Sequence, residues 1–158
     1  MKLLKDKNIP FQGIIAGDGP EKSEMLKLLD ELDLKDNVIY LGNKSHEDLP
    51  YVFNLFDIFI FPTLVESLGL VGLEAMSCSV PVIGSNIPGL QDYIVDNENG
   101  YFFESENYDD LSNKIINFLN LPDLEKNIIK NNCLSTAMKF DSDKVSLELI
   151  NRLNLLVW

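Results

Sequence analysis

The sequence predicts an α/β fold, in which a Rossmann-like parallel sheet carries helices on both faces. Short apolar runs, typical of strands buried on both faces, alternate along the chain with segments of helical periodicity. Two of these runs, Ile58 to Phe61 and Val80 to Ile83, enclose one short helical segment. Strand, helix, strand is the unit that builds a parallel sheet. The length of 158 residues suits one domain, residues 1–158.

The composition argues against several classes of partner. A formal net charge of −12 disfavours nucleic acid and anionic lipid, since both bind to basic surfaces. No apolar run reaches the roughly 18 residues that a membrane-spanning helix needs, and the first residues lack the apolar core of a signal peptide, so we expect a cytoplasmic protein. Cys78 and Cys133 lack metal-ligand spacing, and we expect two buried thiols and no metal site.

The beginning of the chain predicts a helix end, a strand and a longer helix. Residues 1–9 are typical of the end of a helix, and Phe11 to Ala16 form an apolar run. The sequence Gly-Asp-Gly-Pro at 17–20 predicts a tight turn, with Pro20 at the first helical position. The helix is expected to end near Leu34. Its expected buried stripe is Met25, Leu26, Leu28, Leu29 and Leu32.

A second strand and helix follow. Val38 to Leu41 is the next apolar run, and Ser45 with Asp48 predicts the cap of a helix over 46–56. The apolar face of that helix would bury Leu49, Val52, Phe53 and Phe56. The only histidine, His46, follows the cap, where we expect an exposed residue rather than a catalytic base. Hydrolase sites of the Ser-His-Asp or Cys-His type are therefore disfavoured.

The central stretch, residues 58–84, carries the strongest functional signal. After the strand that stops at Pro62, a loop carries Glu66 and leads into a helix over about 69–78, which is almost wholly apolar except for Glu74. In open α/β sheets, ligands bind at the carboxyl ends of the strands, where this loop would lie. The unpaired amides at the start of the helix form a natural site for phosphate, and Gly69 permits close approach of a ligand.

Glu74 suits a neighbouring subsite. At about 1.5 Å of rise per residue, it lies about 7 Å along the helix from the expected phosphate position. That distance matches the step from a diphosphate to its ribose. A carboxylate in so apolar a helix needs partners, and the two hydroxyls of a ribose would supply them.

The remainder predicts a loop at 84–90, a short helix at 90–95 and a strand at 101–103. Three helices should follow over 107–120, 123–139 and 142–155. Asp141-Ser142-Asp143 has the D-x-D form of metal-dependent glycosyltransferases, but it precedes a helical pattern, so we expect a cap. The apolar end of the last helix suits a partner-facing surface and ordinary core packing equally well.

The central stretch resembles the motif of the retaining glycosyltransferases of family 4, which have the two-domain GT-B fold. Two glutamates separated by seven residues, Glu66 and Glu74, stand in the family's order with Glu74-Ala75-Met76 and Pro81-Val82. The Gly-Asp-Gly-Pro turn at 17–20 also matches the family. The chain departs from the family at Ser67 and Ser79, where glycine is usual.

The resemblance implies a role for each site residue. Glu66, as the catalytic residue, would contact hydroxyls of the donor sugar, and Glu74 would hold the ribose. The diphosphate would bind backbone amides of Ser67, Leu68, Gly69 and Leu70. Asn43 and Lys44 would meet the base, although a solvated turn is an equal alternative for them, and Gly89 would face the sugar.

The resemblance also implies missing parts. The chain would begin inside the C-terminal donor-binding domain, after its first strand, and the N-terminal acceptor domain would be absent. In the family an arginine and a lysine before the point matched by Met1 neutralise the diphosphate. Because a leaving diphosphate needs its charge stabilised, we expect little or no transferase activity from the chain alone. We further expect two open sheet edges, which either stay apart, close together or promote self-association.

The implied reaction is transfer of a hexose from a UDP- or GDP-sugar to a glycan or lipid-linked acceptor, with retention of configuration and no cofactor. Its expected role is surface polysaccharide biosynthesis, with the missing domain placing the protein at the inner face of the membrane. A sugar-nucleotide 2-epimerase is a second enzymatic hypothesis. A third is a non-catalytic remnant or interaction subunit that binds sugar nucleotide weakly or not at all.

Overall fold

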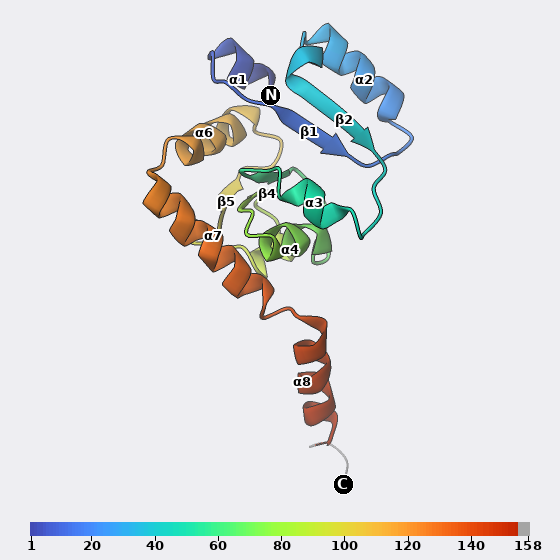
Figure 1. The fold of residues 1–158 in the computed structure, drawn as a ribbon, viewed down its shortest axis with the longest axis vertical. Coiled ribbons are helices and arrows are strands. Elements are labelled where there is room, and N and C mark those ends of the chain that lie inside the picture. Colours follow the sequence, from blue (N-terminus) through green and yellow to red (C-terminus); the bar gives the residue numbers. More distant parts are fainter. Residues whose placement is uncertain (155–158) are drawn as a thin grey trace.

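The strands of the protein form two parallel sheets in a computed structural model that describes residues 1–154 (Figure 1). The first sheet pairs β1 (Gly13–Ala16) with β2 (Val38–Gly42). The second has the order β3-β4-β5, formed by Phe59–Phe61, Val82–Ser85 and Gly100–Phe103. All pairings within both sheets are parallel. The predicted α/β fold with parallel strands is confirmed.

Helices connect the strands and pack around them. They are α1 (Lys2–Asp6), α2 (Lys22–Glu31), a short 3₁₀ turn η1 (Lys35–Asn37), α3 (Leu49–Phe53), α4 (Leu70–Ser77), α5 (Pro88–Gln91), α6 (Tyr108–Leu119), α7 (Asp123–Ala137) and α8 (Ser142–Asn154). Helix α4 packs on α7, and α6 packs on β4 and β5. Helix α8 projects away from the body as a separate arm (Figure 1).

The core is built around β4. All four of its residues are buried, as expected for a strand with a neighbour on each side and helices on both faces. Met76 on α4 and Leu90 on α5 are fully buried beside it. On β5, Tyr101 packs edge-on against Phe118 of α6, with ring centres 6.2 Å apart. These contacts fix the carboxyl ends of β3 and β4 and the loops that follow them.

Strands β1 and β3 have open edges. Among the described residues, β1 pairs only with β2, and β3 pairs only with β4. The predicted open edges are therefore present, and they do not close together into one sheet. The apolar residues of β3 remain partly exposed, in contrast to the fully buried β4. This half-burial follows from the lack of a second neighbouring strand.

Two sequence-based expectations about α2 and α3 are wrong in detail. No residue of α2 is buried, and Leu26 and Leu28 are 38% and 50% exposed, because α2 covers only the two-stranded sheet. Helix α3 is shorter than the predicted 46–56 and begins just before Pro50, whose ring would clash with a helical carbonyl four residues earlier. The predicted Ser45–Asp48 contacts do form, at 2.7 and 3.3 Å, but they close a turn before the helix.

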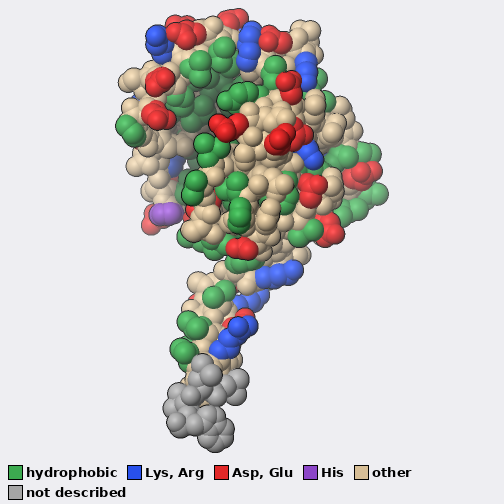
Figure 2. Space-filling view, turned by 180° about the vertical axis from the view of Figure 1, so that it is seen from behind, with side chains coloured by type: hydrophobic (Ala, Val, Ile, Leu, Met, Phe, Trp, Pro, Cys, Tyr) green, Lys and Arg blue, Asp and Glu red, His purple; other side chains and the backbone are tan. Residues whose placement is uncertain are grey.

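The surface is acidic on the body and partly apolar on the arm. Aspartate and glutamate side chains are spread over the face of the body shown in Figure 2. Along α8, hydrophobic side chains lie exposed beside lysine and arginine (Figure 2). The exposed apolar residues of α8 are Val145, Leu147, Leu149, Ile150 and Leu153. Core packing of this helix, one of the two expected alternatives, is therefore absent from the described part of the chain.

Candidate functional site

The predicted site residues lie in loops that follow β2, β3 and β4. The loop after β3, residues 62–69, carries Glu66 and leads directly into α4. The turn after β4 leads into α5, which contains Gly89. Parallel pairing of β3 with β4 puts the carboxyl ends of both strands at one edge. The sequence therefore folds into the strand-loop-helix arrangement that it predicted, with boundaries shifted by one or two residues.

Glu66 is held in a tightly packed loop. Its Oε1 accepts a hydrogen bond of 3.0 Å from the backbone N–H of Ser67. The loop lies directly against α5, because a Cβ added at Gly89 would sit 2.3 Å from the backbone oxygen of Glu66 and 2.9 Å from that of Ser67. Glycine at position 89 is thus required by backbone packing. The structure brings Glu66, Ser67 and Gly89 together.

The backbone at the start of α4 forms an amide cradle, defined here as residues 67–70. Gly69 is the N-cap and has φ +72°, a left-handed conformation that glycine adopts without strain. Its carbonyl accepts hydrogen bonds from the N–H of Gly72, at 2.8 Å, and from the hydroxyl of Tyr93, at 3.2 Å. Leu68 packs against the core, whereas the side chain of Leu70 is exposed. The first amides of such a helix suit an anion.

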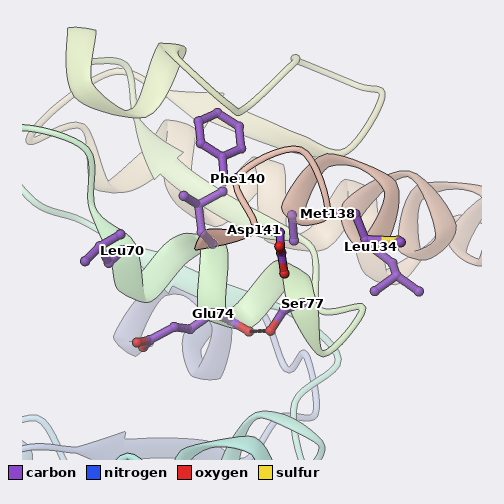
Figure 3. Close-up of a pocket in the computed structure, with 9 residues that line it drawn as sticks. Leu70, Glu74, Ser77, Leu134, Met138, Phe140 and Asp141 are labelled. Atoms are coloured by element: carbon purple, nitrogen blue, oxygen red, sulfur yellow. Dashed lines mark hydrogen bonds between the residues drawn. The ribbon is translucent and has the colours of Figure 1, made fainter. Parts of the chain in front are cut away.

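Glu74 is partly exposed and lies beside the loop that follows β2. Its side chain is 39% exposed, and its Oε1 is 3.8 Å from Nδ1 of His46. In Figure 3 the carboxylate points away from Phe140, while the backbone oxygen of Glu74 accepts a hydrogen bond of 2.7 Å from the Ser77 hydroxyl. The carboxylate therefore faces α3 and the β2 loop, where a bound ribose and base would lie together.

A separate hollow of about 330 Å³ lies between α4 and α7. It is lined mainly by apolar side chains, including Leu73, Leu134 and Met138 (Figure 3). Glu74 contributes to its rim, but the carboxylate is directed elsewhere. This hollow is thus distinct from the space beside Glu66 and His46.

The remaining predicted residues have weaker placement. Asn43 is exposed and Lys44 is half-buried, and within residues 1–154 neither side chain forms a hydrogen bond or an ion pair. The residue of this loop that meets Glu74 is His46, which is 91% exposed, as expected, but was not expected at the site. Its position is set by the turn before α3, which the sequence pattern placed inside a helix.

Tyr93 is the second residue that sequence reasoning missed. It is only 2% exposed, and its hydroxyl contacts the N-cap of α4 from beyond α5. Burial raises the pKa of Tyr93, and the negative charge of Glu66 raises it further. The available signal was Gly72, since a glycine within a helical pattern often marks close approach of another group.

Two properties of the described residues bear on cofactor and membrane chemistry. Residues 1–154 contain no group of three or more histidine, cysteine or acidic side chains arranged to hold a metal ion. Over the same range, every helix is too short or too polar to cross a membrane. Asp141 accepts backbone hydrogen bonds of 3.2 Å from Asp143 and Lys144, so it caps α8 as predicted for the D-x-D sequence.

Comparison with known proteins identifies relatives across most of the chain. The family model for glycosyl transferases group 1 matches residues 1–133. The chain is 30% identical over 132 residues to N-acetyl-alpha-D-glucosaminyl L-malate synthase from Bacillus anthracis, covering 84% of this chain and 34% of that protein. It is 32% identical over 155 residues to O-antigen chain mannosyltransferase B from Escherichia coli, covering 98% and 40%. The chain thus spans about a third to two-fifths of these relatives.

Solved structures share the same fold. Sucrose-phosphate synthase from Thermosynechococcus elongatus superimposes with a TM-score of 0.86 at 26% identity, over 98% of this chain and 41% of that one. TarM from S. aureus gives a TM-score of 0.83 at 26% identity, over 98% and 30%. These matches join the motif around Glu66 and Glu74 to the fold that carries it. The chain belongs to the group 1 glycosyltransferases and has the Rossmann-like α/β fold of their GT-B architecture.

Proposed function

We propose that the chain is the donor-binding domain of a retaining glycosyltransferase. In this proposal it binds a UDP- or GDP-hexose, and the complete enzyme transfers the hexose to a glycan or lipid-linked acceptor in surface polysaccharide biosynthesis. The observation that carries the proposal is the placement of Glu66 and Glu74 on either side of the amide cradle, with His46 beside Glu74. A sugar, a diphosphate and a ribose require this order of contacts.

The names of the relatives support a sugar nucleotide as the ligand. The S. aureus TarM structure was determined in complex with fondaparinux, alpha-GlcNAc-glycerol and UDP. The E. coli relative is an O-antigen chain mannosyltransferase, which supports a hexose donor and a polysaccharide acceptor. The base and the sugar differ between such enzymes, so the donor remains open between UDP- and GDP-hexoses.

Each element of the site has a distinct task in the proposed reaction. The amide cradle stabilises the negative charge that develops on the leaving nucleoside diphosphate as its bond to the sugar breaks. Glu66 orients the sugar hydroxyls, and the acceptor oxygen bonds to the same face of the sugar that the diphosphate leaves. Glu74 fixes the ribose, which positions the reacting bond.

A second candidate function is an interaction subunit without transferase activity. The open edges of β1 and β3 favour it, because unpaired strand edges are natural sites for pairing with another chain. Their apolar, half-buried side chains add a hydrophobic contribution to such pairing. In this alternative the same surface supports self-association.

A titration of the purified chain distinguishes the two functions. UDP, GDP, UDP-glucose and GDP-mannose are added separately, and heat of binding and thermal midpoint are recorded. The donor-binding proposal predicts that one nucleotide series binds and raises the midpoint, since a ligand at 100 times its Kd stabilises by about 2.7 kcal/mol. A folded chain that binds none of them at millimolar concentration contradicts the proposal and leaves the interaction subunit.

A further inference from the structure

The hydroxyl of Tyr93 lies directly beneath the start of α4. Tyr93 follows α5, lies 24 residues beyond Gly69 in the sequence, and donates a 3.2 Å hydrogen bond to the Gly69 carbonyl. Its ring is buried and packs edge-on against Phe140, with ring centres 6.3 Å apart. The side chain therefore has a fixed position between the end of α7 and the amide cradle.

Helix α4 is shaped to receive this hydroxyl. A Cβ added at Gly72 would lie 2.1 Å from the Tyr93 oxygen and 3.0 Å from Cζ of the ring. Gly72 thus leaves the space that the phenol occupies, although glycine within a helix costs about 1 kcal/mol relative to alanine. The pairing of Gly72 with Tyr93 is specific, because a larger residue at 72 would expel the hydroxyl from the Gly69 carbonyl.

The hydrogen bond acts on the peptide that joins Gly69 to Leu70. A donor on the carbonyl of a peptide polarises its N–H, which strengthens that N–H as a donor. The amide in question belongs to Leu70, the first residue of α4, and is one of the groups without an intrahelical acceptor. The phenol thus both fixes the left-handed conformation of Gly69 and strengthens an amide of the cradle.

We propose that Tyr93 is a positioning residue for the diphosphate of the donor, acting through Gly69 on the amide of Leu70. This inference rests on the donor-binding function proposed above and adds a residue from outside the motif to its machinery. Tyr93 itself does not touch the ligand. Burial and the nearby charge of Glu66 both raise the pKa of the phenol, so the hydroxyl stays protonated and remains a donor across the physiological range.

The test compares UDP with UMP, which lacks the terminal phosphate, on the 158-residue chain. Tyr93→Phe removes the hydroxyl and keeps the ring. Calorimetry should show UDP affinity lowered about fivefold, the equivalent of one net hydrogen bond, with UMP affinity changed less than about twofold. Tyr101→Phe is the matched control, because Tyr101 is a buried tyrosine packed against Phe118 and α6. It should leave both affinities unchanged.

A second variant displaces the hydroxyl without removing it. Gly72→Ala should lower UDP affinity selectively, as Tyr93→Phe does, and combining both substitutions should cost less than the sum of the single effects, since the two residues are in direct contact. Equal loss of UDP and UMP affinity with a lowered thermal midpoint indicates a merely structural tyrosine and overturns the inference.

The outcomes separate this inference from the function on which it rests. If the unmodified chain binds UDP and Tyr93→Phe binds it equally well, only the positioning role is overturned. If the unmodified chain binds neither nucleotide series, the donor-binding function is contradicted and the positioning role is rejected with it. Selective loss of UDP affinity in both single variants supports the inference.

Discussion

Nδ1 of His46 lies 3.8 Å from Oε1 of Glu74, so the loop after β2 and helix α4 meet at one point. The two residues come from the two different sheets of the molecule. Their contact places the proposed ribose carboxylate next to the loop proposed to meet the base. It thereby defines one end of the donor site, with Glu66 at the other.

Glu66→Gln should abolish the contribution of the sugar to donor affinity. The amide oxygen of glutamine can still accept the hydrogen bond from Ser67, so the loop should keep its conformation. UDP or GDP alone should bind as before, while the nucleotide sugar loses its additional affinity. Competition calorimetry measures both, with Glu104→Gln, at an exposed position after β5, as the control. A nucleotide sugar that keeps its full advantage over the free nucleotide argues against this role.

Gly89→Ala should destabilise the protein and weaken donor binding. The new Cβ would meet the backbone oxygen of Glu66 at 2.3 Å, and backbone cannot move aside as a flexible side chain can. Overpacking of this kind costs about 1–3 kcal/mol. Urea unfolding measures the loss. Gly19→Ala is the matched control, since its Cβ would meet nothing within 4 Å and should leave stability nearly unchanged.

Stability should fall above about pH 9 because of Cys133. Burial raises the pKa of its thiol from the model value of 9.0 to about 12. Between these values the unfolded chain loses the thiol proton and the folded chain keeps it, so the free energy of unfolding falls as pH rises, by about 1.4 kcal/mol per unit at most. Urea unfolding at pH 8 to 11 should show a shallower decline for Cys133→Ala. An identical slope in both proteins contradicts the assignment.

A lysine on the open edge should reduce self-association. Ile60 lies in the middle of β3, where a charged side chain opposes pairing with another strand. Sedimentation analysis should show concentration-dependent association of the unmodified chain and a shift of Ile60→Lys toward the monomer. Leu124→Lys, on the exposed surface of α7, should not change the association. An unmodified chain that stays monomeric at every concentration removes the basis for the edge hypothesis.

The sequence was sufficient for the order of the elements and the centre of the site. Apolar runs identify strands such as β4 because burial on both faces excludes polar side chains, and the strand-loop-helix unit locates Glu66 and the amide cradle. Burial within α2 was not predictable, since a helical stripe shows which face is apolar and not how wide a sheet lies beneath it. Helix α3 was predicted too long because the cap at Ser45 was given more weight than Pro50.

Contacts between distant segments had no periodic signal. Tyr93 reaches Gly69 across 24 residues of sequence, and His46 reaches Glu74 from the other sheet. Both contacts depend on how helices pack rather than on local pattern. Gly72 marked the first contact indirectly, but nothing in a single sequence shows which side chain fills the space above a glycine.

The central claim is that Glu74 binds the ribose of a nucleotide donor. The most direct measurement is calorimetric titration of the chain and of Glu74→Ala with UDP, or with GDP if that series binds, and with the matching 2′,3′-dideoxynucleotide. Glu125→Ala, at an exposed position on α7, serves as the control. The unmodified chain should prefer the intact ribose at least about tenfold, as expected for hydrogen bonds to a carboxylate.

Glu74→Ala should bind both nucleotides with the same weak affinity. This result would assign the preference for the intact ribose to the Glu74 carboxylate. If Glu74→Ala instead keeps the full preference for the intact ribose, another group binds the ribose, and the proposed orientation of the donor between Glu66 and Glu74 is wrong.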